Sequence, residues 1–84
     1  MPAVHPWLTE AAGRLARAAG VTESELELSE EESELLLRVA GRAAHESGER
    51  TNAPLLCHLL GVTHAKSGRS LAELIGAVEK DGAA

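Results

Sequence analysis

The residues best suited to chemistry form one polar stretch, HESGERTN, at positions 45–52. It leads into a segment with Pro54 near its start, which is typical of the first turn of a helix. A helix N-terminus presents backbone N–H groups and the positive end of a dipole, and both favour an anion. Arg50 would pair with a phosphate or carboxylate through two parallel hydrogen bonds. The sequence therefore predicts an anion site with these candidate ligands: His45, Arg50, Thr51 and Asn52.

The same polar stretch also has a purely structural interpretation. In that interpretation Asn52 caps the helix that follows, because asparagine is a preferred N-cap residue. Arg50 then pairs with Glu46 or Glu49, and no ligand binds. The sequence leaves both interpretations open.

Spacings that metal and nucleophile sites require are absent from the sequence. Four histidines and one cysteine are present, but no H-x-x-x-H or C-x-x-C pair occurs among them. Cys57 lies among leucines, which indicates an inert buried thiol. The glutamates of residues 23–34 are expected to be solvated, so nothing there tunes a carboxyl group for acid–base work. We expect no catalytic residue and no metal site, and the chain is not expected to be an enzyme.

Negative charge is concentrated in one part of the 84-residue chain. Residues 23–34 hold seven glutamates and no basic residue, and the formal net charge of the whole chain is −5. Such a run is typical of a solvated loop and a first helical turn, where glutamates suit the helix dipole. An acidic docking edge for a basic partner is the alternative.

Helical periodicity and capping residues predict an all-α protein. Apolar residues recur at intervals of three and four, and no segment alternates with period two as a strand would. Capping-box spacings occur at Thr22–Glu25, Ser29–Glu32 and Ser70–Glu73. The predicted helices span residues 7–19, 30–47, 53–67 and 71–80, with a short helical turn at 23–27. Short connections favour antiparallel neighbours, so we expect a compact bundle of four helices in a single domain, residues 1–84.

Residues 53–67 are expected to form the most buried helix, because leucine and valine nearly encircle it. Trp7 is the only aromatic residue, so leucine, valine and alanine must build the core. Such a core buries little area per side chain. The sequence therefore predicts a homo-oligomer, or a state docked on another protein, as the stable form.

Each predicted helix has a glycine near its middle: Gly13, Gly41, Gly61 and Gly76. A glycine inside a helix costs about 1 kcal/mol relative to alanine. Since only a hydrogen side chain lets another backbone or a flat ligand lie directly against a helix, the four glycines predict close packing at these positions.

A helix-turn-helix over residues 55–75 would place Gly61 in the turn and would use residues 70–80 as the reading helix. Glu73 and Glu79 on that helix would repel phosphates, so nucleic-acid binding is disfavoured.

No segment of the sequence approaches the length of a membrane span, which needs about 20 apolar residues. The single cysteine suits a reducing compartment, and the first ten residues, MPAVHPWLTE, lack the features of a signal peptide. We expect a cytoplasmic protein without membrane contact.

Three segments carry a resemblance to a known domain: WLTEAAGRLARAAGV, RVAGRAAHESGERTNAPLLCHLLGV and SGRSLAELIGAVE. They resemble a small bacterial helical domain that occurs alone or at the C-terminus of proteins similar to molybdenum cofactor guanylyltransferases. The resemblance covers residues 7–79. Its most distinctive residues are Val39, Ala40, Ala44, His45, Arg50, Ala53, Pro54 and Leu55.

The resemblance implies a non-catalytic accessory role in molybdopterin-guanine dinucleotide biosynthesis. The partner would be a nucleotidyltransferase or a molybdoenzyme, and the ligand, molybdopterin or a guanine nucleotide, would contact Arg50. Transferase activity is not implied, because this chain lacks the Gly-rich loop and the metal-binding acids of the transferase domain. A generic protein–protein interaction or homodimerisation module is the alternative function.

Overall fold

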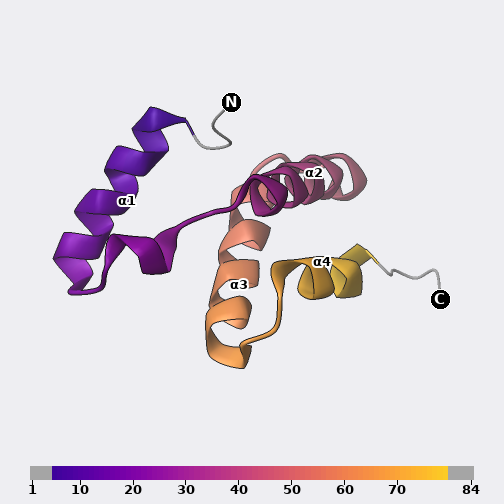
Figure 1. Ribbon diagram of the computed structural model, residues 1–84. Coiled ribbons are helices and arrows are strands. Elements are labelled where there is room, and N and C mark those ends of the chain that lie inside the picture. The colour runs from indigo at the N-terminus through magenta and orange to yellow at the C-terminus, as the bar shows by residue number, and fades with distance from the viewer. Residues whose placement is uncertain (1–4, 80–84) are drawn as a thin grey trace. The chain divides into compact units, whose positions relative to one another are not determined.

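The computed structural model describes residues 5–79, which form four α-helices and one short 3₁₀ helix (Figure 1). The α-helices are α1 (Pro6–Ala19), α2 (Glu30–Ser47), α3 (Asn52–Ser67) and α4 (Leu71–Glu79), and the 3₁₀ helix is η1 (Glu23–Leu26). The described residues contain no strand, so the predicted all-α class is confirmed. The helices also lie where they were predicted. The end of the last helix at residue 80 lies outside the described residues.

The chain divides into two compact units, residues 1–33 and residues 34–84, called unit 1 and unit 2 below. Each unit is described by itself. The packing of all four helices into one bundle, and hence one domain over residues 1–84, stays a prediction.

Unit 1 is a helix with a short return segment. α1 ends at Gly20, whose φ of 74° is left-handed and therefore favours glycine. The backbone N–H of Val21 donates to the carbonyl of Ala16 (3.0 Å), which closes this turn and sends the chain back so that η1 contacts α1. The buried residues of α1 are the small ones, Gly13 and Ala16. Small side chains thus let η1 lie close to the helix.

Two of the predicted capping boxes differ in outcome. Ser29 and Glu32 form the full box at the start of α2: each backbone N–H donates to the other residue's side chain, at 3.0 Å in both cases. At η1 the Thr22 hydroxyl instead donates to the carboxylate of Glu25 (3.1 Å), and Thr22 makes no side-chain cap bond. The box predicted there is therefore wrong, because the two side chains satisfy each other.

Unit 2 has a small core made by three helices. Val39 of α2, Leu60 of α3, and Leu71 and Ile75 of α4 are buried and form one cluster. Ile75 is only 1% exposed. Four partly buried leucines pack against this cluster: Leu35, Leu36, Leu56 and Leu74.

The connection from α3 to α4 is held by several hydrogen bonds. Gly68 ends α3 in the left-handed region, and the His64 ring Nδ1 donates to the carbonyl of Arg69 (2.5 Å). Ser70 caps α4 by accepting from the N–H of Glu73 (3.1 Å). The Glu73 carboxylate accepts from Arg69 (2.8 Å) instead of completing the predicted box. These bonds orient α4 so that Ile75 faces the core.

The predicted burial of α3 is wrong. Leu60 is the only buried residue of the helix, whereas Leu55 and Leu59 are 61% and 60% exposed. The physical reason is that the core of unit 2 lies on the side of α3 that carries Leu60. Apolar residues on the opposite side have no cover within the unit.

Candidate functional site

The predicted anion site lies at the connection between α2 and α3. α2 ends at Ser47, and Gly48 turns the chain with a φ of 74°. His45, Arg50 and Thr51 are exposed, and Asn52 is half-buried. No hydrogen bond or ion pair joins the side chains of these four residues in the described part of the chain. The four residues are near one another in the sequence, but the fold does not join their side chains into a cluster.

Backbone donors at the start of α3 are already used. The N–H of Asn52 donates to the carbonyl of Glu49 (3.1 Å), and the N–H of Ala53 donates to the carbonyl of Arg50 (3.2 Å). Pro54 has no N–H. The first turn of α3 thus offers an anion no N–H group from residues 52–54.

The purely structural interpretation of this stretch is wrong about the Arg50 ion pair and about the Asn52 cap. Glu46 pairs with Arg42 (2.7 Å), and Arg50 makes no ion pair among residues 5–79. Asn52 belongs to α3 itself, and the N-cap residue is Thr51, whose side chain makes no cap hydrogen bond. Arg50 is left as an exposed cation whose contact with a ligand stays a prediction.

Close packing at the mid-helix glycines is limited to one of the four. Gly13 is buried, and a Cβ atom there would lie 3.4 Å from Glu23 Oε2. A Cβ atom at Gly41, Gly61 or Gly76 would meet no atom within 4 Å, and all three glycines are exposed. Within the single chain the packing prediction is therefore wrong for these three, because they lie away from the core of unit 2.

Cys57 is half-buried on α3, and burial raises the pKa of its thiol. A raised pKa keeps the thiol protonated and weakly nucleophilic at neutral pH, in agreement with the predicted inert thiol. Among residues 5–79 no three histidine, cysteine or acidic side chains lie close enough to hold a metal ion.

An apolar surface runs along the exposed side of α3. Leu55, Leu59 and Val62 have the spacing i, i+4 and i+7, so they share one helix face, called the α3 face below. Leu60 points to the core, and Lys66 is the only residue of α3 with a full charge. Sequence reasoning found these apolar residues but assigned them to the core. The sequence did indicate that some of these residues would be exposed. Leucines on every side of a helix are more numerous than a small core can bury.

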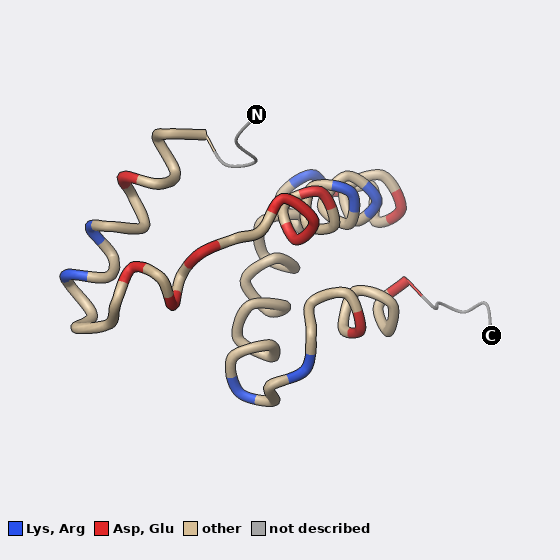
Figure 2. Tube along the Cα trace, viewed as in Figure 1, with Lys and Arg blue, Asp and Glu red and all other residues tan. Residues whose placement is uncertain are grey.

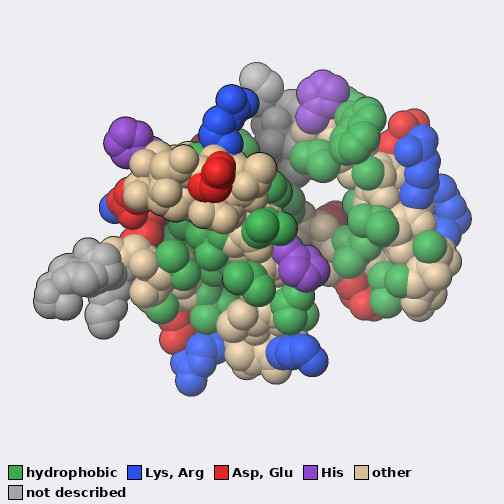
Figure 3. Space-filling model, turned by 180° about the vertical axis from the view of Figure 1, so that it is seen from behind, with side chains coloured by type: hydrophobic (Ala, Val, Ile, Leu, Met, Phe, Trp, Pro, Cys, Tyr) green, Lys and Arg blue, Asp and Glu red, His purple; other side chains and the backbone are tan. Residues whose placement is uncertain are grey.

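Unit 1 contains an apolar groove that sequence reasoning missed. Leu8 and Leu15 of α1 form one wall, Leu26 and Leu28 form the other, and the groove encloses about 710 Å³. We call it the α1 groove. Exposed hydrophobic side chains are visible over α1 as well as over unit 2 (Figure 3). The sequence feature that points to the second wall of the groove is the alternation of glutamate and leucine in ELEL, residues 25–28.

The edge of the α1 groove is acidic. Glu23 and Glu27 line it, and among residues 5–79 no lysine, arginine or histidine does so. Figure 2 shows that acidic residues follow one another along η1 and into the start of α2. Neither Glu23 nor Glu27 makes an ion pair in the described part of the chain.

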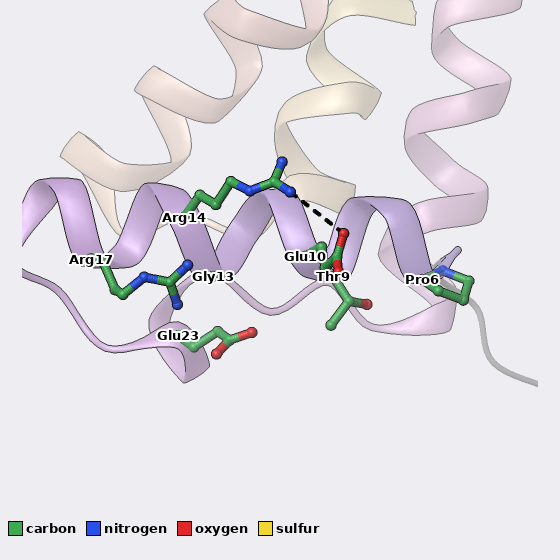
Figure 4. Close-up of a pocket in the computed structure, with 7 residues that line it drawn as sticks. All are labelled: Pro6, Thr9, Glu10, Gly13, Arg14, Arg17 and Glu23. Atoms are coloured by element: carbon green, nitrogen blue, oxygen red, sulfur yellow. Dashed lines mark ion pairs between the residues drawn. The ribbon is translucent and has the colours of Figure 1, made fainter.

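A second cavity of unit 1, of about 560 Å³, is lined by charged residues of both signs (Figure 4). Arg14 pairs with Glu10 at 3.6 Å, which is the expected i, i+4 pair. Arg17 and Glu23 point into the same space. Two arginines and two glutamates leave the cavity without net charge, so it does not select an anion.

α3 runs without a break through Gly61 to Ser67. The turn that a helix-turn-helix would need at this glycine is therefore absent. Across residues 5–79, no helix combines the length and the apolarity of a membrane span.

Comparisons with known protein families, with curated proteins and with solved structures find no match to the chain.

Proposed function

We propose that this chain is a non-catalytic helical interaction module that associates with a second copy through the α3 face. A helix that is apolar all round is typical of one that is covered on all sides. The core of unit 2 covers the side with Leu60 only, and Leu55 and Leu59 remain 61% and 60% exposed. This uncovered apolar face is the observation that carries the proposal.

Charge favours a second copy as the partner of the α3 face. Residues 34–84 hold six acidic and six basic side chains, so unit 2 has no formal net charge. Two copies of unit 2 therefore meet without net repulsion between them. The α3 face itself is uncharged, and a twofold axis would bring the same patch of both copies together.

The proposal is tested by the mass of the protein in solution at different concentrations. Light scattering coupled to gel filtration should give a mass that rises from one copy towards two over a concentration range of about a hundredfold. A mass of one copy throughout that range would contradict the proposal.

An accessory role in molybdopterin-guanine dinucleotide biosynthesis is a second and more specific candidate. It is supported by the resemblance over residues 7–79, whose most distinctive residues lie in the second half of α2, in the connection to α3 and in the first turn of α3. Arg50 is exposed there and makes no ion pair among the described residues. In this candidate function Arg50 contacts the phosphate of molybdopterin or of a guanine nucleotide, and a nucleotidyltransferase or a molybdoenzyme is the partner.

Titration with GTP, followed by the amide signals of the labelled chain, tests the ligand of this second candidate. Binding at the connection between α2 and α3 should shift the signals of Arg50 and Asn52. The substitution Arg50→Gln should abolish the shifts, whereas Arg69→Gln, which removes an exposed arginine elsewhere in unit 2, should leave them unchanged. Unshifted signals with both GTP and molybdopterin would contradict a ligand at this place.

A further inference from the structure

We infer that the α1 groove binds a cationic amphipathic helix of a partner protein. This inference rests on the proposed role as an interaction module and gives that module a second surface with a different kind of partner. It is carried by the shape of the groove, by its exposed apolar walls and by its acidic edge.

The apolar walls are long enough for about two turns of a bound helix. On α1 the lining of the groove runs from Leu8 to Leu15, and seven steps of 1.5 Å give a wall about 10 Å long. Leu8 and Leu15 are seven residues apart, so they lie on one face of α1, and they are 48% and 63% exposed. Leu26 and Leu28 supply the facing wall at 39% and 37% exposure. An apolar groove of this form accepts side chains spaced i, i+3 or i+4, and i+7 on an incoming helix.

An extended peptide is the less suitable occupant. Binding by strand addition requires an exposed strand edge whose backbone groups can pair with the peptide. Residues 5–79 contain no strand, so the groove has no such edge.

Charge selects a cationic occupant. Residues 1–33 hold seven acidic and two basic side chains, a formal net charge of −5. A second copy of unit 1 would bring the same charge to the groove, and like charges oppose association. Nucleic acids and the cytoplasmic face of membranes are also negative, so the same repulsion applies to them. A helix with lysine or arginine beside its apolar stripe would place cations next to Glu23 and Glu27, which line the groove.

The test measures binding of a fluorescent synthetic peptide of about five helical turns to the full chain. The peptide has leucine at helical spacing and lysine on its flanks. Two controls accompany it: the same peptide with glutamate in place of lysine, and a lysine peptide of identical composition in scrambled order. We expect only the ordered lysine peptide to bind, and we expect binding to weaken as salt rises from about 0.05 to about 0.5 M.

Matched substitutions locate the binding. Leu15→Ser in the groove should weaken binding about tenfold, because a leucine that becomes buried contributes about that much affinity. Leu37→Ser makes the same change at an exposed leucine of α2, which lies outside both the groove and the α3 face and is 74% exposed against 63% for Leu15, and it should leave the affinity unchanged. Glu27→Lys should weaken binding, whereas Glu34→Lys, the same change in the same acidic run but outside the groove, should not.

Several outcomes would overturn the inference. Equal binding of the scrambled or the glutamate peptide would show that neither an ordered apolar stripe nor positive charge is recognised. Absence of binding, or an unchanged affinity of Leu15→Ser, would show that the groove is not the site. A dimer that dissociates on Leu15→Ser would show that a second copy occupies the groove. Self-association through the α3 face is measured without the peptide, so failure of this inference and failure of the proposed function are separate results.

Discussion

Arg38 on α2 lies 3.7 Å from Glu79 on α4, measured between Nη2 and Oε1. Arg42 Nη1 lies 3.9 Å from the other oxygen of the same carboxylate. That oxygen is buried and accepts no hydrogen bond within the described residues, and the Glu79 side chain is 19% exposed. The carboxylate therefore holds the end of α4 to α2 through charge. The contact closes the core of unit 2 on the side away from the connection between α3 and α4.

Replacing Glu79 by glutamine should lower the free energy of unfolding by about 1 kcal/mol, because the variant keeps the shape of the side chain but loses both ion pairs. Urea unfolding followed by circular dichroism measures the effect. Glu73→Gln is the control, because Glu73 makes an exposed pair with Arg69, four residues before it in the connection to α4, and its side chain is 54% exposed. An equal loss in the two variants would contradict the role given to Glu79.

Ile75→Ala should destabilise unit 2 strongly. Removing a fully buried isoleucine leaves a cavity and costs about 2–5 kcal/mol, which is a large part of the stability of a unit this small. Val78→Ala on the same helix is the control, because Val78 is 46% exposed and should cost well under half as much. Thermal unfolding measures both variants. If Val78→Ala were as unstable as Ile75→Ala, the assignment of Ile75 to the core and of Val78 to the surface would be wrong.

Alanine at the exposed mid-helix glycines should stabilise the chain. At Gly41, Gly61 and Gly76 an added Cβ atom meets nothing within 4 Å, so the gain in helix propensity, about 0.5–1 kcal/mol each, is not offset by a clash. The midpoint of thermal unfolding of each variant, measured at low protein concentration, should rise. A fall in the midpoint would show that close packing, as predicted from the sequence, does occur at that glycine.

The Cys57 thiol should react slowly with iodoacetamide. Burial raises the pKa of the thiol above its ordinary value of 9.0, so less thiolate is present at a given pH than in the unfolded chain. The folded chain then holds this proton to higher pH than the unfolded chain does. The stability that the protonated thiol contributes is therefore present below the unfolded pKa and is lost as pH rises through the folded pKa.

Alkylation rates across alkaline pH, with and without urea, check this prediction. The rate in the folded chain should reach its half-maximum at higher pH than the rate in urea. Because Cys57→Ala has no thiol to ionise, this variant should lose less stability at high pH than the unchanged chain does. A folded chain that reacts as fast as the unfolded one near neutral pH would contradict the buried thiol.

Positions of the helices could be predicted because their signals are local. Gly20 and Gly68 end helices through left-handed backbone, and Ser29 with Glu32 opens α2 through bonds between residues three apart. Such signals act over a few residues, so neither the arrangement of the helices nor the division into two units affects them.

Burial could not be predicted in the same way, because it depends on which helices meet. Leu59 and Leu60 are adjacent and identical in type, yet one is 60% exposed and the other 4%. The backbone bonding at the candidate anion site could not be predicted either: the carbonyls of Glu49 and Arg50 accept the N–H groups of Asn52 and Ala53. The α1 groove arises only when η1 returns along α1, and the alternation in residues 25–28 does not predict that return by itself.

Sedimentation equilibrium of three proteins tests most directly whether the α3 face is an interaction surface. They are the unchanged chain, Leu59→Glu on the α3 face, and Ala72→Glu at an exposed position of α4 as the control for an added charge. All three should remain folded by circular dichroism. We expect the unchanged chain and Ala72→Glu to associate alike, and we expect Leu59→Glu to be monomeric at every concentration. Association of Leu59→Glu as strong as that of the unchanged chain, or a monomeric unchanged chain, would contradict the account.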